Sequence, residues 1–210
     1  MSAQKPASWA YAEDFVIESE VVQAARRRGE ELGCTPVGVG VGAALRMVAA
    51  ASAARAVVEI GTGAGVSGLW MLEGMPADGI LTTIDIDAEH QRAAREAFSA
   101  AGVAHQRTRV IQGRALEVLD RMTDGAYDLV LVDGEKTEYP DYVVQATRLL
   151  RSGGVMVVDN MLWKDHVADP TARDEVTRTL RDLGKGLRDD VRFATSLLPV
   201  GDGLLVAVKR

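Results

Sequence analysis

Regular alternation between strand-like and helix-like segments is the feature that most constrains this chain. Short apolar runs with the length and composition of buried strands lie at 56–60, 80–85, 108–113, 127–133 and 155–159. Segments of helical periodicity separate them, at 66–75, 88–102, 116–122 and 140–154. Strands joined through helices run parallel, and a parallel sheet is covered on both faces. The alternation therefore predicts an α/β fold with helices on both faces of a central sheet.

The C-terminal part breaks this alternation. A polar helix is expected from about Thr171 to Leu187, and strand-like segments follow at 191–200 and 203–210. The turn sequence PVGDG lies between these two segments and leaves no room for a crossover helix, so they must form an antiparallel hairpin. The predicted sheet thus has seven strands, five of them parallel and two in the hairpin.

The first third of the chain is expected to be helical, over 14–32 and 43–54. A single domain that spans 1–210 is predicted. A length of 210 residues with 47% hydrophobic content suits one domain with a sizeable core.

Charge and composition limit the classes of function. The formal net charge of −6 argues against a nucleic-acid-binding protein, which usually has a basic balance. No apolar run reaches the roughly 18 to 20 residues of a membrane span, and the N-terminus does not resemble a signal peptide. A cytoplasmic protein without membrane contact is expected. The single cysteine, Cys34, is expected to be a small buried or half-buried side chain.

A glycine-rich turn follows the first predicted parallel strand. Gly61, Gly63 and Gly65 allow a tight turn and the close approach of a ligand to the backbone at a helix N-terminus. The turn suits a dinucleotide, S-adenosylmethionine or a phosphate, although the third glycine of the dinucleotide fingerprint would fall on Val66. Asp85 ends the next strand and could bind both ribose hydroxyls of an adenosine, or could cap the following helix.

Glu59 is an unexpected residue for a buried strand. It lies two residues before Gly61, where an unpartnered carboxylate would be costly. The α-ammonium of a methionine moiety or the backbone amides of the glycine turn could supply a partner. Ser67, near the start of the next helix, could bind the carboxylate end of the same ligand.

Three oxygen-bearing side chains follow two other strands. Asp133 ends the fourth parallel strand, and Asp159 and Asn160 end the fifth. If the first, fourth and fifth strands are neighbours, these side chains converge beside the glycine turn. Two carboxylates and an amide oxygen suit Mg²⁺, Mn²⁺ or Ca²⁺ and leave about three coordination positions open. The alternative is that the two aspartates are helix caps and Asn160 is a turn residue.

Several segments together resemble the cation-dependent O-methyltransferases, the family of catechol and caffeoyl-CoA O-methyltransferases. The segments are EIGTGAGVS, TIDID, LVDGEKTEYPDY, GGVMVVDNMLWKDHVADP and LPVGDGLLVAVKR, and the resemblance runs from about Val41 to the C-terminus. It implies the Rossmann-like fold of class I methyltransferases, S-adenosylmethionine as cofactor, a divalent cation and a homodimer. It also implies that the N-terminal helices, within residues 1–55, contribute to the acceptor pocket or to dimer contacts.

Site residues are implied by the same resemblance. Glu59 and Gly61 would line the methionine part of the cofactor, Ser67 would hold its carboxylate, Asp85 would bind the ribose and Ala115 would lie beside the adenine. Asp133, Asp159 and Asn160 would bind the metal, and Lys136 would be the general base. The predicted cofactor contacts are completed by Val41, Gly63 and Asp133.

The predicted function is methyl transfer to a metal-chelated hydroxyl of a small catechol-like or phenolic acceptor. The fourth-strand sequence departs from the family's frequent Asp-Ala-Asp-Lys, and Glu135 stands where catechol O-methyltransferase has a tryptophan. A hydroxylated uridine of tRNA is the alternative acceptor, with the arginine run 26–28 as its phosphate contact. An NAD-dependent oxidoreductase and a non-catalytic cofactor-binding protein are the alternatives from other classes.

Three further side chains have simpler interpretations. Lys136 could be a surface lysine paired with Glu135 or Glu138. Trp163 is expected to pack under the active-site loop, with stacking on the acceptor as the alternative. His166 is expected to be a surface loop residue.

Overall fold

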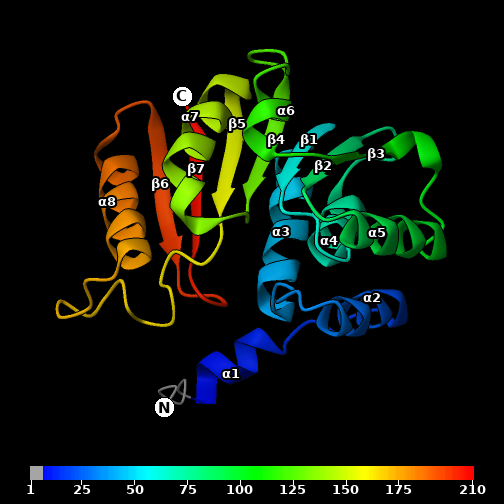
Figure 1. The fold of residues 1–210 in the computed structure, drawn as a ribbon, viewed down its shortest axis with the longest axis horizontal. Coiled ribbons are helices and arrows are strands. Elements are labelled where there is room, and N and C mark those ends of the chain that lie inside the picture. The colour runs from blue at the N-terminus through cyan, green and yellow to red at the C-terminus, as the bar shows by residue number, and fades with distance from the viewer. Residues whose placement is uncertain (1–6) are drawn as a thin grey trace.

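The computed structural model describes residues 7–210, which form one seven-stranded sheet with helices on both faces (Figure 1). The strand order is β3-β2-β1-β4-β5-β7-β6. Strands β1 to β5 pair in parallel, and β7 runs antiparallel to both β5 and β6, so the predicted sheet is confirmed. The strands are β1 (Ala56–Ile60), β2 (Ile80–Asp85), β3 (Thr108–Gln112), β4 (Tyr127–Val132), β5 (Leu150–Val158), β6 (Phe193–Leu198) and β7 (Leu204–Lys209).

Eight α-helices accompany the sheet in the described residues. They are α1 (Ala7–Glu13), α2 (Glu20–Glu31), α3 (Val39–Ala51), α4 (Val66–Gly74), α5 (Ala88–Ala100), α6 (Ala115–Leu119), α7 (Tyr139–Leu149) and α8 (Glu175–Asp189). Among the helices of residues 7–210, none has both the length and the apolar character needed to cross a bilayer.

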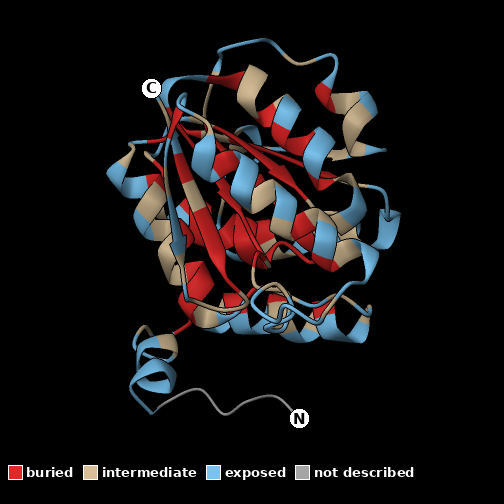
Figure 2. Ribbon diagram, turned by 90° about the vertical axis from the view of Figure 1, so that its left-hand side faces the viewer, coloured by how far each residue is buried: buried red, intermediate tan, exposed pale blue. Residues whose placement is uncertain are grey.

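Alternating side chains along the strands build two apolar core layers. Val57 and Leu129 point into the layer covered by α2, α3, α4 and α5. Val58 and Val130 point into the opposite layer, which α6, α7 and α8 cover. The strands are buried between helices whose outer faces are exposed (Figure 2). This packing fixes the register of every strand end on which the site depends.

The N-terminal helices differ from the prediction. A single helix over 14–32 is wrong, because α1 ends at Glu13 and α2 begins at Glu20. The β-branched residues Val16 and Ile17 lie in the non-helical connection. Ser19 then caps α2, since its hydroxyl accepts a hydrogen bond from the N–H of Val22 at 3.4 Å.

Two later boundaries also differ. The polar helix begins at Glu175 rather than near Thr171, because the carboxylate of Asp174 caps it by accepting from the N–H of Thr177 at 2.9 Å. Strand β5 begins at Leu150, five residues before the predicted start, and α7 is correspondingly shorter. The ammonium of Lys209 donates to the carbonyl of Leu150 at 2.7 Å and holds this early part of the strand.

Candidate active site

A cleft lies at the carboxyl ends of the parallel strands, beside the point where the strand order reverses between β1 and β4. Two adjoining cavities of about 560 and 810 Å³ form this cleft, a size typical of small-molecule sites. Both cavities are lined by Gly61, Asp85, Asp133 and Lys136. Four of the residues singled out from the sequence are therefore brought together by the fold.

The glycine turn has backbone angles that favour glycine. Gly61, Gly63 and Gly65 have φ values of 98°, 49° and 87°. A β-carbon on Gly61 would lie 2.2 Å from the carbonyl oxygen of Asp133, so only glycine lets β1 and β4 end this close together. The carboxylate of Asp85 accepts the N–H of Gly63 at 2.9 Å and holds the turn open toward the cleft.

Asp85 is not the cap of the following helix. That role belongs to Asp87, whose carboxylate accepts from the N–H of Glu89 at 2.7 Å. Asp85 lines both cavities, which is compatible with its predicted ribose contact.

Glu59 is fully buried and is held by hydroxyls. Ser67 Oγ donates to Glu59 Oε1 and Thr83 Oγ1 donates to Glu59 Oε2, each at 2.5 Å. Thr83 also shares a hydrogen bond of 2.7 Å with Thr62, whose hydroxyl accepts from Gln91 at 3.2 Å. The partners of Glu59 are thus side chains of β2 and α4 rather than the backbone amides of the glycine turn.

The protonation of Glu59 follows from its surroundings. Burial raises its pKa to about 7, although the hydroxyls of Ser67 and Thr83 oppose the rise. Ser67 lines the smaller cavity, whereas Glu59 lies behind it. Contact between Glu59 and the α-ammonium of a ligand, and between Ser67 and its carboxylate, stays a prediction.

The three predicted metal ligands meet at the ends of β4 and β5. The N–H of Asp133 donates to the carbonyl of Ile60 at 2.9 Å, and the N–H of Asp159 donates to the carbonyl of Val132 at 3.1 Å. Strand β5 ends at Val158, and Asn160 has a φ of 59°, in the left-handed region. The chain therefore bends at the point where two neighbouring side chains would have to face one ion.

The chemistry of this donor set fits a hard cation. Asp159 Oδ1 is buried and has no hydrogen-bond partner among the described residues, which is costly for a carboxylate oxygen. Burial raises the pKa of Asp159, and the nearby carboxylate of Asp133 raises it further. A bound cation would supply the missing partner and favour both ionised forms. No cluster of three or more His, Cys, Asp or Glu in residues 7–210 is arranged for a metal, and this set has only two such residues plus an amide.

Lys136 lies beside these carboxylates. Its ammonium donates to Asp133 Oδ1 at 2.9 Å, to the Gly134 carbonyl at 3.2 Å and to the Tyr139 hydroxyl at 2.7 Å. It is therefore paired with Asp133 and not with Glu135 or Glu138. Burial raises the pKa of Tyr139 well above its ordinary value, so Tyr139 keeps its proton.

The remaining predicted residues lie in different parts of the structure. Ala115 lines the larger cavity, and its contact with the adenine stays a prediction. Val41 is buried within α3, in the core layer under α4, and lines neither cavity, so its placement gives no support to a cofactor contact. His166 lies on an exposed loop, with its side chain 52% accessible, as predicted.

Trp163 lines both cavities, so it lies where its predicted alternative role, stacking on the acceptor, would take place. Sequence reasoning missed another part of the cleft wall. His90 also lines both cavities, and residues 34–37, between α2 and α3, line the smaller one. His90 and residues 34–37 gave no signal, because only the tertiary fold brings them to the glycine turn.

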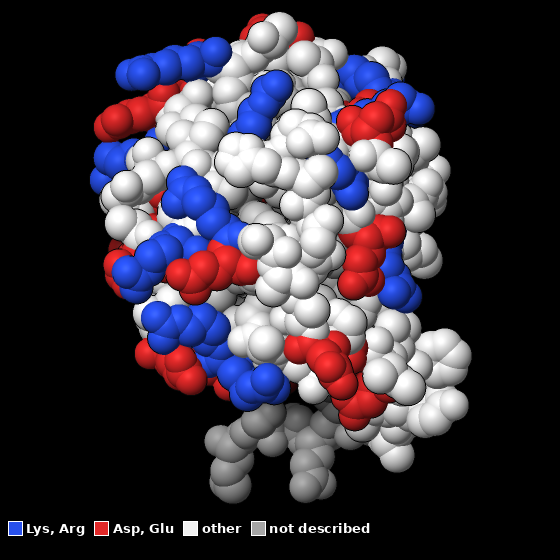
Figure 3. Space-filling model, turned by 90° about the vertical axis from the view of Figure 1, so that its right-hand side faces the viewer, with Lys and Arg blue, Asp and Glu red and all other residues white. Residues whose placement is uncertain are grey.

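Two of the three arginines in the run on α2 form ion pairs within the protein. Arg26 binds Glu18 through two hydrogen bonds, of 3.1 and 2.5 Å, and Arg28 pairs with Glu31 at 3.0 Å. On the face that carries α2 and α5, basic and acidic side chains are interspersed (Figure 3). An RNA acceptor stays a prediction, and this face offers it no continuous basic surface.

The sheet order, the antiparallel last strand and the glycine turn after β1 define a class I S-adenosylmethionine-dependent methyltransferase. The profile of the O-methyltransferase family matches residues 9–210. A Mycobacterium tuberculosis protein named "Probable O-methyltransferase" is 48% identical over 201 residues, covering 96% of this chain and 90% of the relative. A relative from Mycolicibacterium smegmatis is 46% identical over the full length of both chains.

Similar solved structures share the fold of this chain. The O-methyltransferase TomG of Streptomyces achromogenes, solved with S-adenosylmethionine, has 29% identity and a TM-score of 0.85, with 99% of each chain covered. A Corynebacterium glutamicum protein has 31% identity and a TM-score of 0.88, with 95% of this chain and 94% of that chain covered. The chain belongs to the O-methyltransferase family. The family and the structures solved with the cofactor support S-adenosylmethionine as its cofactor, in place of the NAD-dependent alternative.

Proposed function

We propose that this O-methyltransferase depends on a divalent cation and methylates one oxygen of a small acceptor with two adjacent hydroxyls, such as a catechol. The observation that carries the proposal is the meeting of Asp133, Asp159 and Asn160 at one end of the sheet, with Asp159 Oδ1 buried and unpartnered. This set lies directly beside the glycine turn, since Asp133 touches Gly61. Acceptor and cofactor would therefore share one cleft.

The chemistry requires an oxyanion. A phenol with a pKa near 10 is only about 0.1% ionised at pH 7, and a bound Mg²⁺ or Mn²⁺ would stabilise the anion. Asp133, Asp159 and Asn160 would hold this ion. Three protein ligands leave about three positions, which suffice for two oxygens of a diol and a water.

Lys136 and Trp163 would act on the acceptor itself. Lys136 already uses the three N–H donors of its ammonium, so it would have to release one of these partners to stabilise the acceptor oxygen. As the general base it would first have to lose a proton. Trp163 lines both cavities and offers an aromatic face to a flat ring. The cofactor carries its own leaving group, so the protein mainly aligns oxygen, methyl group and sulfur.

The test is methyl transfer from labelled S-adenosylmethionine to catechols, flavonoids, phenolic coenzyme A esters and hydroxyuridine-containing RNA. We expect turnover of at least one small diol in the presence of Mg²⁺. Removal of the metal by a chelator should lower it by about tenfold or more, and added Mg²⁺ should restore it. Undiminished turnover of a diol in excess chelator would contradict the cation dependence, and transfer to RNA alone would favour the tRNA alternative.

A further inference from the structure

Most basic side chains in the cleft already lie beside a carboxylate. Lys136 pairs with Asp133 at 2.9 Å, and His90 Nδ1 lies 3.6 Å from Asp85. Arg114 pairs with Glu138 at 3.0 Å. Lys164 also lines the cleft, yet within residues 7–210 its ammonium forms no ion pair. Its charge is therefore available to a ligand.

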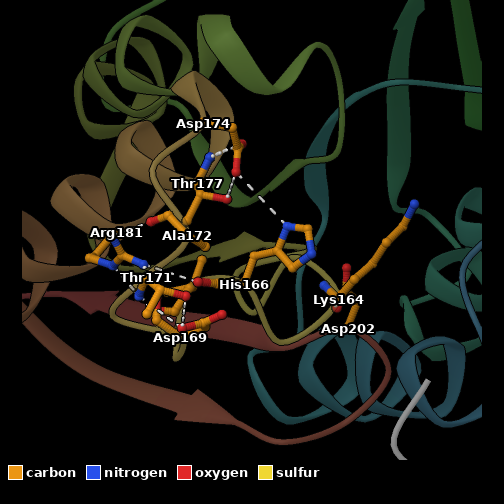
Figure 4. Close-up of polar contacts among 10 residues, drawn as sticks. Lys164, His166, Asp169, Thr171, Ala172, Asp174, Thr177, Arg181 and Asp202 are labelled. Carbon is orange, nitrogen blue, oxygen red and sulfur yellow. Dashed lines mark hydrogen bonds and ion pairs between the residues drawn. The ribbon is translucent and has the colours of Figure 1, made fainter. Parts of the chain in front are cut away.

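The loop that carries Lys164 is held in place by α8. The guanidinium of Arg181 donates to four carbonyls of this loop, those of His166, Val167, Asp169 and Ala172, at distances from 2.8 to 3.2 Å. Figure 4 shows Arg181 reaching into the loop from its helix. Because one side chain satisfies four backbone acceptors, these hydrogen bonds stabilise the shape of the loop.

A second anchor holds Lys164 itself. Its N–H donates to Asp202 Oδ1 at 2.6 Å, and the N–H of Leu162 donates to the Asp202 carbonyl at 2.8 Å. Trp163, Lys164 and Asp165 have φ values of 46°, 55° and 67°, so three successive residues adopt a left-handed conformation that is costly without such support.

These anchors direct the Lys164 side chain away from the acidic residues of the loop. In Figure 4 its ammonium extends away from Asp169 and Asp174, and also from Asp202 near its own backbone. The ammonium lies 5.6 Å from the centre of the Trp163 ring, a cation–π distance. Lys164 and Trp163 thus form a pair on one wall of the cleft, four and three residues after the metal-ligand candidate Asn160.

We propose that Lys164 determines acceptor specificity by binding a carboxylate on an aromatic diol. The inference rests on the proposed function and narrows it. An aromatic ring packed against Trp163 would bring a substituent on its outer edge toward the Lys164 ammonium. A carboxylate there would gain a charge-assisted hydrogen bond, whereas an acceptor with an ammonium substituent would be repelled.

The experiment compares three diols: protocatechuate with a carboxylate, catechol without a charged substituent and dopamine with an ammonium. Their binding is measured by calorimetry with S-adenosylhomocysteine and Mg²⁺ present, and their turnover with S-adenosylmethionine. In Lys164→Gln the preference for protocatechuate over catechol should fall about fivefold in both Kd and kcat/KM. Lys164→Glu should lower it further and raise the preference for dopamine over catechol. Lys185→Gln, an exposed lysine on α8 outside the cleft, should leave both preferences unchanged.

Different measurements test the proposed function and the role of Lys164 in acceptor specificity. Catechol binding and turnover by the wild-type enzyme test the proposed function, and the ratios test Lys164. Ratios that stay within experimental error in both Lys164 variants would overturn the proposal. Equal loss for all three diols would show that Lys164 only supports the loop, and would also overturn it.

Discussion

Asp159→Ala and Asn160→Ala should each lower kcat for methyl transfer about 100-fold or more, while binding of S-adenosylmethionine changes little. The expected size corresponds to about 3 kcal/mol of lost stabilisation of the acceptor oxyanion. Cofactor binding should survive, because neither side chain belongs to the glycine turn or to the Glu59 hydrogen-bond network. The two quantities are measured by turnover with saturating Mg²⁺ and by calorimetry with the cofactor.

The matched control is Asp202→Asn, which keeps a side-chain oxygen for the N–H of Lys164 and lies in the same cavity wall. It should affect turnover far less than either ligand variant.

Removal of the buried, unpartnered Asp159 oxygen should also leave the apo protein no less stable, because an uncompensated buried carboxylate destabilises the fold. Normal turnover of Asp159→Ala in the presence of chelator would show that the metal mechanism is wrong.

Glu59→Gln should make the apo protein more stable at pH 8 and weaken cofactor binding. Glu59 has a pKa of about 7 in the folded protein and an ordinary value of 4.5, so the folded state binds more protons between these values. Stability contributed by Glu59 is therefore complete below about pH 4.5 and is lost as the pH rises through 7. The full loss is about 3 kcal/mol, at about 1.36 kcal/mol for each unit of pKa.

Glutamine removes this titration and preserves hydrogen bonding. Its oxygen can accept from Thr83, and its amide can donate to the Ser67 hydroxyl, which can turn to accept. The difference in unfolding free energy between Glu59→Gln and wild type should shift by about 3 kcal/mol in favour of the variant between pH 4.5 and pH 8. Glu96→Gln, on the exposed face of α5, should show no such shift.

Cofactor affinity provides the second measurement on Glu59. If Glu59 takes the α-ammonium, the glutamine variant loses an ionic partner and should bind S-adenosylmethionine about tenfold more weakly or worse. Stability and binding would then change in opposite directions, as expected for a strained functional residue. If the affinity for S-adenosylmethionine is unchanged while stability rises as predicted, Glu59 has only a structural role beside the glycine turn.

The alternation of apolar and amphipathic segments was sufficient to predict the sheet. Parallel strands buried on both faces have a distinctive composition, and the short PVGDG turn requires an antiparallel pair. Helix ends were predicted less well, because single hydrogen bonds decide them. Ser19 caps α2 and Asp174 caps α8. In the sequence, neither capping residue is a stronger signal for the helix start than the periodicity of the apolar residues around it.

In the candidate site, too, some features follow from the sequence and others only from the tertiary structure. The sequence by itself determined which side chains end the strands, namely the glycine turn, Asp85, Asp133, Asp159 and Asn160, because strand ends follow from local composition. Only the tertiary structure decided which groups became their partners: Thr83 for Glu59, Tyr139 for Lys136, and Arg181 for the loop that presents Trp163 and Lys164. Some of these contacts join residues far apart in the chain, and others depend on the direction of a side chain. Both the long-range contacts and the side-chain directions are determined by the packing of the whole fold.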